Sequence, residues 1–344
     1  MADPKFVFFH HPTCAAHHPG PGHPEHPGRV ADVIPQIQTL FPENPWRESR
    51  LATVDEIART HDNIHLERVA RTEGVAHTAL DPDTHTSEQS YRAARYAVGA
   101  ALDVVDHCLS NAGGSAFAVV RPPGHHATPS QAMGFCLFNN IAVATDYALA
   151  RPDIDRVAII DIDVHHGNGT QDAFYDRGEV LFVSLHRYPF YPGTGSLDEV
   201  GSGDGRGWTI NIPLPGGCGD SEYLWLFEQT VEPAVAAHQP DLILVSAGFD
   251  TWWRDPLGGF SLTGTAYAHL AQVIYGLAAR YCGGRVGWIM EGGYAQEGLI
   301  EGIGAIARGH PTTSGKRPFE AEMPPNSWVD DLLRTAKLRH HMLR

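Results

Sequence analysis

The most informative stretch of the chain is VAIIDIDVHHGNGT, residues 157–170, in which a buried-strand pattern leads directly into acidic and imidazole side chains. Burying a carboxylate or an imidazole without a partner costs several kcal/mol, so these groups need something to bind. Asp163 and His165 are two residues apart and would therefore point to the same side of an extended segment. With Asp250 they offer two carboxylates and one imidazole, and three protein ligands with an open fourth position are typical of a catalytic zinc site. The alternative interpretation is that the two aspartates cap neighbouring helices.

Two further segments carry groups that could act beside such a metal. RPPGHHA contains His125 and His126, either of which could serve as the base for a metal-bound water, on a chain constrained by two prolines and a glycine. EGGY contains Tyr294, and a phenol aimed at a polarised carbonyl would stabilise the negative charge that develops on its oxygen. After two glycines, its loop is expected to flex. The structural alternatives are a histidine pair that only stabilises a loop and a tyrosine that only anchors one.

The elements that must position these groups alternate between apolar, β-branched runs and helical patterns. Strands are predicted at 5–9, 116–120, 156–163, 180–185, 241–247 and 285–290. Helices are predicted at 87–110, 139–150, 221–238 and 263–281. This alternation indicates a mostly parallel sheet with helices on both faces, and such sheets bind ligands at the carboxyl ends of their strands. Because four of the predicted strands lead into the candidate residues, the pattern predicts one site at one edge of a single domain.

Composition limits the possible functions. The 344 residues are 42% hydrophobic and carry a net charge of −15. That charge argues against a nucleic-acid partner, which needs a basic face to neutralise phosphates. The N-terminus has no basic region followed by a long apolar run, and no apolar run approaches about 18 residues, so neither a signal peptide nor a membrane span is expected. Five widely spaced cysteines without a CxxC pair indicate reduced thiols and predict a cytoplasmic location.

Five segments together resemble the zinc-dependent histone deacetylase superfamily in order and spacing. They are RPPGHHA…GFCLFNN, DIDVHHGNGTQDAFY, SLHRYPFYPGTG, SAGFD…DPLGG and EGGY. The superfamily includes class II histone deacetylases, bacterial deacetylase-like amidohydrolases and acetylpolyamine amidohydrolases. The resemblance spans residues 20–307 and implies the arginase/deacetylase fold: a single α/β deacetylase domain over 1–344 with a central, mostly parallel sheet of about eight strands flanked by helices. Residues 308–344 are expected to form a C-terminal extension with a terminal helix.

The resemblance also implies a role for each residue of the predicted site. Three residues would bind one catalytic Zn²⁺, which acts as Lewis acid and water activator: Asp163, His165 and Asp250. His126 would be the general base and then the acid, with His125 as its electrostatic partner, and Tyr294 would polarise the amide carbonyl. Asp161 would hold His125, and Asn168 would hold His126. The asparagine is similar to the class II pattern, and a neutral amide there leaves His126 less basic than a carboxylate would.

A narrow substrate tunnel is implied as well, suited to a linear alkyl chain that ends in an acetamide. Phe135 and Tyr191 would form its aromatic walls, and the Gly134 carbonyl would accept the amide N–H of the substrate. Asp83 would bind the substrate at the rim, and Leu257 of the DPLGG loop would also belong to the substrate-binding residues. The family's structural K⁺ would be bound by backbone carbonyls of Asp161, Asp163 and His165, with Ser184 and Leu185.

The segment from His10 to His26 contains six histidines, which raises the question of a second metal. Class IIa relatives bind a structural zinc near a similar HPEH stretch with two or more cysteines, whereas only Cys14 lies nearby here. An ordered, proline-rich rim loop is therefore favoured over a metal site. Class IIa enzymes also carry a histidine at the position of Tyr294, so that weakly active subclass is not expected.

The favoured function is zinc-dependent hydrolysis of acetyl or acyl amides of linear amines, by a deacetylase that acts on acetyl-lysine. The first alternative is an acetylpolyamine amidohydrolase with the same chemistry. Animal polyamine-selective relatives have an acidic residue at the position of Leu257, so the leucine favours acetyl-lysine as the substrate. Bacterial polyamine enzymes, however, have their acidic gate elsewhere.

Two other functions are less favoured. An acyl-amine binding protein without catalysis would lack a ligand, the base or the tyrosine, and none of these is missing. An arginase-like ureohydrolase needs two metals bridged by further aspartates, and Gly167 stands where one of them would be required. The expected partner is an acetylated lysine or a small acetylated amine, and the sequence is compatible with a homo-oligomer.

Overall fold

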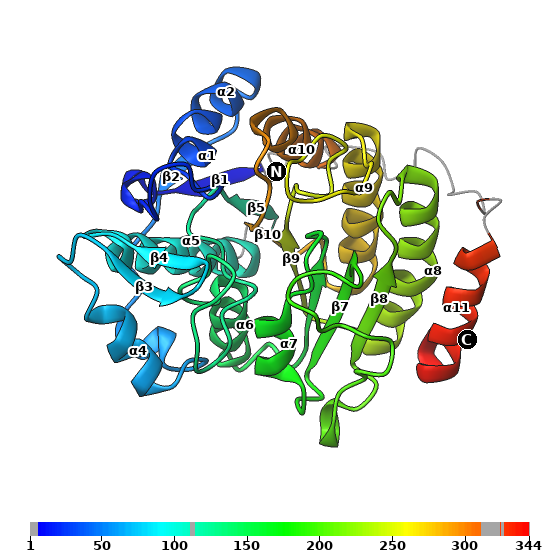
Figure 1. The fold of residues 1–344 in the computed structure, drawn as a ribbon. Coiled ribbons are helices and arrows are strands. Elements are labelled where there is room, and N and C mark those ends of the chain that lie inside the picture. The colour runs from blue at the N-terminus through cyan, green and yellow to red at the C-terminus, as the bar shows by residue number, and fades with distance from the viewer. Residues whose placement is uncertain (1–5, 111–113, 311–323, 325–326, 344) are drawn as a thin grey trace.

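The structure is a computed structural model that describes residues 6–110, 114–310, 324 and 327–343. Its centre is an eight-stranded sheet in which every neighbouring pair of strands is parallel (Figure 1). In spatial order the strands are β2 (Trp46–Glu48), β1 (Val7–His10), β5 (Ser115–Ala118), β10 (Val286–Met290), β9 (Leu242–Ala247), β6 (Val157–Asp161), β7 (Val180–Arg187) and β8 (Thr209–Leu214). A separate antiparallel hairpin consists of β3 (Thr78–Asp81) and β4 (Thr84–Thr86).

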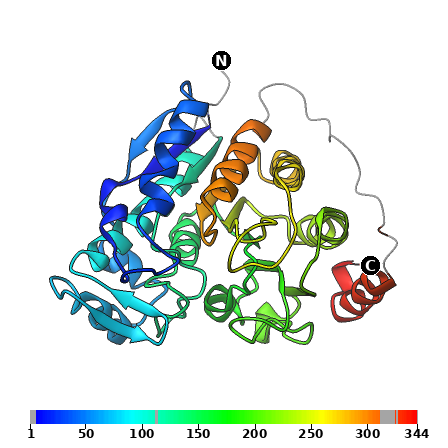
Figure 2. The same ribbon diagram turned by 45° about the horizontal axis from the view of Figure 1, so that its top comes forward.

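Helices cover both faces of the large sheet (Figures 1 and 2). One group consists of α5 (Ser90–Leu109) and α6 (Asn140–Leu149), which pack on each other and on the central strands. A second group consists of α8 (Asp220–His238), α9 (Gly264–Tyr281) and α10 (Gln296–Gly309), with α9 packed between its neighbours. The other helices are α1 (Gly28–Ala31), α2 (Val33–Leu40), α3 (Val54–Ile57), α4 (Asn63–Ala70), α7 (Asn168–Phe174), α11 (Ser327–Arg339) and the 3₁₀ helices η1 (Pro12–Ala16), η2 (Gly203–Gly205) and η3 (His341–Leu343).

The central strands form because their sequences are almost entirely apolar, with polar residues only at or near their carboxyl ends. Every residue of β6 (VAIID), β9 (LILVSA) and β10 (VGWIM) is buried. Parallel strands that are covered on both faces have such continuous apolar runs, and full burial of one Val, Leu or Ile side chain contributes about 1.5–3 kcal/mol. Polar residues begin where each strand ends, so the carboxyl edge of the sheet is the place where polar side chains gather. The single α/β domain with about eight strands, predicted from the sequence, is confirmed.

The predicted elements are present, with shifted ends and some omissions. The four predicted helices correspond to α5, α6, α8 and α9. The strand predicted at 156–163 is wrong at its end, because β6 stops at Asp161. Sequence analysis does not find β8, whose apolar run is interrupted by Asn211 and Pro213, or β2, which has only three residues. Lys5, predicted to begin a strand, lies outside the described residues, and α11 lies in the region where a terminal helix is expected.

Two further findings concern the apolarity of the helices and the state of the cysteines. Among the described residues, no helix combines the length and apolarity needed to cross a membrane. All five cysteines are described, and each is buried and free of disulfide bonds.

Candidate active site

Four neighbouring strands of the sheet, β5, β10, β9 and β6, end at the same edge. The loop after each strand carries one of the predicted groups. The histidine pair follows β5, Tyr294 follows β10, Asp250 follows β9, and Asp163 with His165 follows β6. Because these strands are consecutive in the sheet, the topology brings together residues that are far apart in the sequence.

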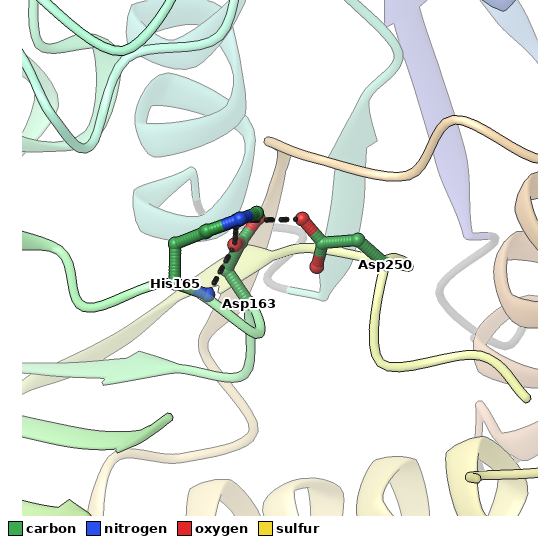
Figure 3. Close-up of side chains that lie close together, drawn as sticks. All are labelled: Asp163, His165 and Asp250. Carbon is green, nitrogen blue, oxygen red and sulfur yellow. Dashed lines mark hydrogen bonds and ion pairs between the residues drawn. The ribbon is translucent and has the colours of Figure 1, made fainter. Parts of the chain in front are cut away.

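Asp163, His165 and Asp250 meet at this edge (Figure 3). His165 Nδ1 lies 3.1 Å from Asp163 Oδ1 and 3.0 Å from Asp250 Oδ2. The potential ligand atoms of the three residues lie within 4.8 Å of one another, and none of the three residues is more than 9% exposed. One imidazole nitrogen and two carboxylates gathered this closely are a donor set that Zn²⁺ accepts, so the residues fit the metal that the sequence predicts.

The two candidate ligands after β6 reach this position by a route that differs from the prediction. Asp163 and His165 do not lie on an extended strand, because β6 ends at Asp161 and a bend follows. The Asp163 N–H donates to Asp161 Oδ1 at 3.1 Å, and the His165 N–H donates to Asp163 Oδ1 at 2.9 Å. A carboxylate that accepts a backbone N–H two residues ahead stabilises a tight turn. Two successive turns, rather than strand alternation, therefore direct both side chains to one point.

Backbone N–H groups hold the remaining oxygens of the two carboxylates. Asp250 Oδ1 accepts from the Val164 N–H at 2.9 Å, and Asp163 Oδ2 accepts from the Gly292 N–H at 2.8 Å. A Cβ atom on Gly292 would lie 2.2 Å from Asp250 Oδ2 and 2.5 Å from Asp163 Oδ2. The first glycine of EGGY is therefore required for this close approach of the backbone to the carboxylates, whereas the sequence suggested only a flexible loop.

His125 and His126 lie side by side, with ring centroids 4.1 Å apart. His125 Nδ1 lies 3.0 Å from Asp161 Oδ2, and His126 Nδ1 lies 2.8 Å from Asn168 Oδ1. All four residues are buried. The structure thus brings each histidine into contact with the residue that the resemblance assigns to it.

The two histidines differ in charge. Burial by itself disfavours the charged imidazole, but the carboxylates of Asp163 and Asp161 overcome this and raise the pKa of His125 to about 10. Burial and the neighbouring imidazoles His125 and His165 lower the pKa of His126 well below 6.5. His126 is therefore neutral at physiological pH, while His125 carries a proton.

The three-residue cluster shows the pKa shifts of a site that is rich in carboxylate. Burial and the charge of Asp163 raise the pKa of Asp250 to about 7. Burial would lower the pKa of His165, but its hydrogen bonds to Asp163 and Asp250 raise it to about 9. A proton on His165 Nδ1 thus lies between the carboxylates, at the place where a cation would be bound. Such opposed shifts in one buried cluster are typical of functional sites.

Tyr294 lies beside the cluster, in a loop that is fixed at its backbone. The Tyr294 N–H donates to Asp255 Oδ2 at 2.6 Å, and the Arg29 guanidinium lies 4.9 Å from the centroid of the tyrosine ring. The ring also packs edge-on against Phe135, with centroids 5.9 Å apart. Burial, with further contributions from the Asp250 and Asp163 charges, raises the pKa of the phenol well above 10, so the hydroxyl keeps its proton and can donate it in a hydrogen bond.

The predicted tunnel residues surround the same point. Tyr191 packs edge-on against His126, with ring centroids 5.1 Å apart. Gly134 and Phe135 both have positive φ, 57° and 68°, and this strained turn is fixed by the hairpin β3–β4. Asp83 Oδ1 accepts from the Gly134 N–H at 3.1 Å. Asp83 thus supports the tunnel wall, in addition to any contact with substrate at the rim.

Thr84 is a residue that sequence analysis misses. Its Oγ1 accepts from the Phe135 N–H at 3.0 Å and so helps to hold a non-glycine residue in the left-handed region. No local pattern could have shown this, because the contact joins residues 51 positions apart. Leu257, the other predicted tunnel residue, is half-buried, and its N–H donates to Asp255 Oδ1 at 2.9 Å. Asp255 therefore fixes both the DPLGG loop and the EGGY loop.

The two residues assigned to the potassium site lie on β7, next to the strand that carries Asp161. Ser184 is paired with Asp161 in the parallel register of β6 and β7. The Ser184 hydroxyl lies 2.9 Å from His186 Nδ1, and the Leu185 carbonyl accepts a long hydrogen bond of 3.4 Å from the Tyr223 hydroxyl. The β7 part of the backbone that the resemblance assigns to K⁺ therefore lies beside the end of β6, where the bend of Asp163 and His165 begins.

Sequence analysis also misses a buried ion network beside the site, here called the Glu25 network: His17, Glu25, Arg29 and Arg121. Arg121 Nε and Nη2 each donate to the Glu25 carboxylate at 2.7 Å, and Arg29 Nη1 donates to it at 3.1 Å. Arg29 also donates to the carbonyls of Glu291 and Gly293, at 2.5 and 2.7 Å, and so fixes the backbone of EGGY. The only local signal for the network is the acid–base pair four residues apart in HPEHPGR.

The Glu25 network orders part of the histidine-rich segment. His17 Nε2 lies 3.3 Å from Glu25 Oε2, and the His11 ring stacks on Tyr96 with centroids 3.4 Å apart. His23 packs against Phe135 at 4.6 Å. Across the part of the chain that the structure describes, the only group of three or more potential ligand side chains within 4.8 Å is the one at Asp163, His165 and Asp250.

Glu291, the first residue of EGGY, is a further buried acid that sequence analysis does not assign. Its Oε2 accepts from the Gly124 and His125 N–H groups, at 2.6 and 3.1 Å. Burial raises the pKa of this carboxyl to about 7. The loop after β10 therefore holds the loop that carries the histidine pair.

Comparison with known proteins agrees with this geometry. A histone deacetylase domain model matches residues 23–309. A protein of Oryza sativa subsp. japonica named "Histone deacetylase 10, chloroplastic" is 39% identical over 86% of this chain and 71% of its own length. A protein of Archaeoglobus fulgidus named "Probable deacetylase" is 34% identical over 96% of this chain and 94% of its own. The crystal structure of the HDA15 HD domain matches with a TM-score of 0.89 and 35% identity, over 99% of this chain and 97% of that one. Matches of this extent, in sequence and in structure, show that the chain belongs to the histone deacetylase family and has the arginase/deacetylase fold.

Proposed function

We propose that this deacetylase-family protein is a zinc-dependent amidohydrolase that removes acetyl groups from acetyl-lysine side chains. The observation that carries the proposal is a neutral His126 beside the three-ligand cluster, with its ring centroid 5.9 Å from that of His165. A general base must be unprotonated at the working pH and close to the water that it deprotonates. His126 meets both conditions, and His125 does not meet the first.

Zn²⁺ held by Asp163, His165 and Asp250 would supply a Lewis acid that polarises the amide carbonyl and lowers the pKa of the attacking water. His126 donates its Nδ1–H to Asn168 Oδ1, so its Nε2 is free to accept the proton of the water. The same nitrogen then passes this proton to the leaving amine. His125 keeps its own proton, and its positive charge favours the developing oxyanion.

Tyr294 supplies the second stabilising group. Its hydroxyl stays protonated, so it can donate to the carbonyl oxygen as negative charge develops there. Asp255 and Arg29 hold the backbone and the ring from two sides, so the hydroxyl is positioned before the substrate arrives. A donor fixed in this way needs no reorganisation during the reaction.

The substrate acetamide would lie between Phe135 and Tyr191, with its N–H donated to the Gly134 carbonyl. Positive φ at Gly134 and Phe135 turns this segment toward His126, and a Cβ on Gly134 would lie 2.4 Å from the His126 ring. Glycine at this position therefore keeps the wall of the tunnel against the base. We also propose a structural K⁺ on the backbone of Asp161 and Ser184, which are paired across β6 and β7.

An acetylpolyamine substrate is the alternative, and the DPLGG loop distinguishes the two. Leu257 places an apolar side chain where a polyamine-selective site would need a carboxylate for the second ammonium group. The direct test is to assay the zinc-loaded protein on acetyl-lysine peptides, acetylputrescine and acetylspermidine. We expect the highest kcat/KM on the peptides, and Leu257→Glu should shift the preference toward acetylspermidine. A wild-type preference for acetylspermidine would support the alternative, and no hydrolysis of any of the three would contradict the proposal.

The assignment of the base has its own test. His126→Ala should lower kcat/KM by roughly 10²–10⁴, the usual contribution of a general base, and more than His125→Ala does. The acidic limb of the wild-type pH profile should lie below 6.5, because the pKa of His126 is lowered. If His125→Ala lowers kcat/KM more than His126→Ala does, then His125 is the general base and His126 is its electrostatic partner.

A further inference from the structure

His165 is held in an unusual way for a metal ligand. A histidine that binds a metal through one ring nitrogen almost always donates its other N–H to a carboxylate, a carbonyl or water, which fixes the orientation of the ring. His165 Nδ1 faces Asp163 and Asp250, so Nε2 is the nitrogen left to make this bond. Within residues 6–110, 114–310 and 327–343, no protein group is hydrogen-bonded to His165 Nε2. The protein groups that restrain the plane of this imidazole are therefore those that contact its face and edges.

The face of the imidazole is covered by an aromatic ring. Phe190 stacks on His165 with ring centroids 5.3 Å apart and planes inclined by only 13°. Tyr191, the next residue, meets the same imidazole edge-on, at 6.2 Å and 80°. A near-parallel stack restrains rotation about the Cβ–Cγ bond, because a turned imidazole would lose contact over its whole face. Phe190 therefore restrains the plane in which His165 presents Nδ1.

A guanidinium also lies over the Phe190 ring. Arg187 Cζ lies 4.0 Å from the centroid of the phenyl ring, close enough for a cation–π contact. Arg187 Nη1 also donates to the Gly258 carbonyl at 3.1 Å, in the DPLGG loop. The guanidinium thus contacts the phenyl ring, and the phenyl ring contacts the imidazole; this set is here called the Arg187 stack: Arg187, Phe190 and His165.

The backbone of Arg187 is tied to the same bend. Its N–H donates at 2.8 Å to the carbonyl of Val164, the residue between the two ligands that follow β6. Two glycines allow the guanidinium to fit: a Cβ on Gly216 would lie 3.2 Å from Nε, and one on Gly259, which has φ +78°, would lie 2.7 Å from Nη1. One residue at the end of β7 therefore joins the ligand bend, the loop of Phe190 and the DPLGG loop.

From this geometry we propose that Arg187 and Phe190 are positioning residues for the metal ligand His165, and that the Arg187 stack replaces the hydrogen bond that usually orients such a histidine. The inference rests on the proposed zinc function. Groups that orient a ligand from outside typically change metal affinity by about 10–100-fold when they are removed. The Arg187 stack should therefore act on zinc binding itself, before any effect on substrate.

The test measures the zinc dissociation constant of metal-free protein by competition with a chelator. Phe190→Leu removes the ring and should weaken zinc binding by about 10–100-fold. Arg187→Met keeps the aliphatic length but removes the planar cation, and a loss of about tenfold is expected, at the lower end of the same range. Phe190→Tyr keeps the stacked ring and should bind zinc as the wild type does. The double variant Arg187→Met/Phe190→Leu should be no weaker than Phe190→Leu alone, because the two residues act as one unit.

The chain offers a matched control in a second arginine–aromatic stack. Arg254 lies 4.0 Å from the ring of the exposed Trp253 and is itself exposed. Arg254→Met removes an identical contact that does not involve a ligand and should leave zinc affinity unchanged. Melting temperatures of the metal-free variants identify the temperature range in which all of them are folded, and affinities are compared there.

The outcomes distinguish a failure of the Arg187 stack from a failure of the proposed zinc function. Wild-type affinity in both Phe190→Leu and Arg187→Met would overturn the inference while leaving the zinc proposal intact, and so would a Phe190→Tyr variant as weak as Phe190→Leu. A wild-type protein that binds no zinc would instead overturn the proposed function, and the inference with it.

Discussion

Two clusters of buried charge meet at Tyr294, and they differ in how their charges are balanced. In the Glu25 network, one carboxylate accepts from two guanidinium groups at 2.7–3.1 Å. In the second cluster, here called the Asp163 cluster, three carboxylates face two imidazoles: Asp161, Asp163, Asp250, His125 and His165. Five charged residues of the two clusters have no measurable solvent exposure: Glu25, Arg121, Asp161, Asp163 and Asp250.

The charge balance determines what each cluster does to its own members. Burial would raise the pKa of Glu25, but Arg121 and His17 hold it well below the usual value. Asp250 shows the opposite behaviour, because burial and the neighbouring Asp163 raise its pKa to about 7. Glu25 and Asp250 are buried to the same extent, yet their pKa values are shifted in opposite directions. A carboxylate held by two guanidinium groups stays ionised and stabilises the fold, whereas a cluster with more carboxylates than imidazoles favours the binding of a cation.

The largest effect is expected when a carboxylate is removed from the Asp163 cluster. Asp250→Ala should reduce bound zinc to near zero and abolish amide hydrolysis, because a three-ligand site that loses one ligand no longer holds the metal. Metal analysis and an amide assay measure the two effects. Asp198→Ala, which removes an exposed carboxylate paired with Arg339, is the control and should keep both. Stoichiometric zinc and full activity in Asp250→Ala would refute the ligand assignment.

The second change removes charge from the Glu25 network. Glu25→Gln leaves Arg121 and Arg29 buried without a counter-charge, and breaking a buried ion pair in this way costs about 3–5 kcal/mol. Urea unfolding of the metal-free protein measures the free energy of unfolding. Asp250→Asn is the matched variant: it keeps an acceptor for the Val164 N–H but removes a repelled charge, so the metal-free protein should be as stable as the wild type or more stable. Equal destabilisation by both variants would show that the Glu25 network and the Asp163 cluster do not differ in their charge balance.

A third, smaller effect is expected at the junction of the two clusters. Tyr294 has its ring beside Arg29 of the Glu25 network, and its phenol feels the charges of Asp250 and Asp163. Tyr294→Phe removes only the hydroxyl and should lower kcat by roughly 10²–10³, about 2.7–4 kcal/mol, because one oxyanion donor is lost. Zinc content, melting temperature and KM should change little, and an activated trifluoroacetyl amide should be less affected. A loss of stability with unchanged kcat would show that the tyrosine is only a loop anchor.

The smallest effect, taken per pH unit above about pH 7, is the pH dependence of zinc affinity. In the metal-free protein the pKa of His165 is raised to about 9, so below this pH zinc must displace a proton from Nδ1. Affinity should therefore rise with pH up to about 9, by about tenfold or 1.4 kcal/mol per pH unit. Below about 7, protonation of Asp250 adds to the slope. Chelator competition between pH 6 and 8 tests this, and an affinity that is flat over that range would contradict it.

The sequence predicts the parts of this molecule that depend on local pattern. The apolar runs of β6, β9 and β10 are continuous, and each ends at chemically distinctive residues, so both the sheet edge and the residues gathered there could be inferred. The path that the chain takes beyond the end of each strand could not be inferred from the sequence. The bend that aligns Asp163 with His165 is made by side chain–backbone hydrogen bonds after the strand has ended.

Contacts over long sequence distances account for the other omissions. Arg29 acts on Gly293, which is 264 residues away, and nothing near either residue indicates the other. Phe135 adopts a conformation that its residue type disfavours, and the hydroxyl that holds it there comes from the β3–β4 hairpin. Such long-range contacts produce no periodic or compositional pattern in the sequence, so only the folded structure shows them.

The position of β10 in the sheet has a consequence for how the protein is made. This strand is the last of the eight in the sequence, yet it lies in the interior, where it pairs with β5 on one side and β9 on the other. The three strands β2, β1 and β5 join the other four in the described sheet only through it. A ribosome that has released the chain as far as β9 has therefore made two half-sheets with exposed, apolar edges and no bond between them. The chain must be translated through β10 before the two halves of the candidate active site can meet, so translation products that end before β10 should be inactive and prone to aggregate.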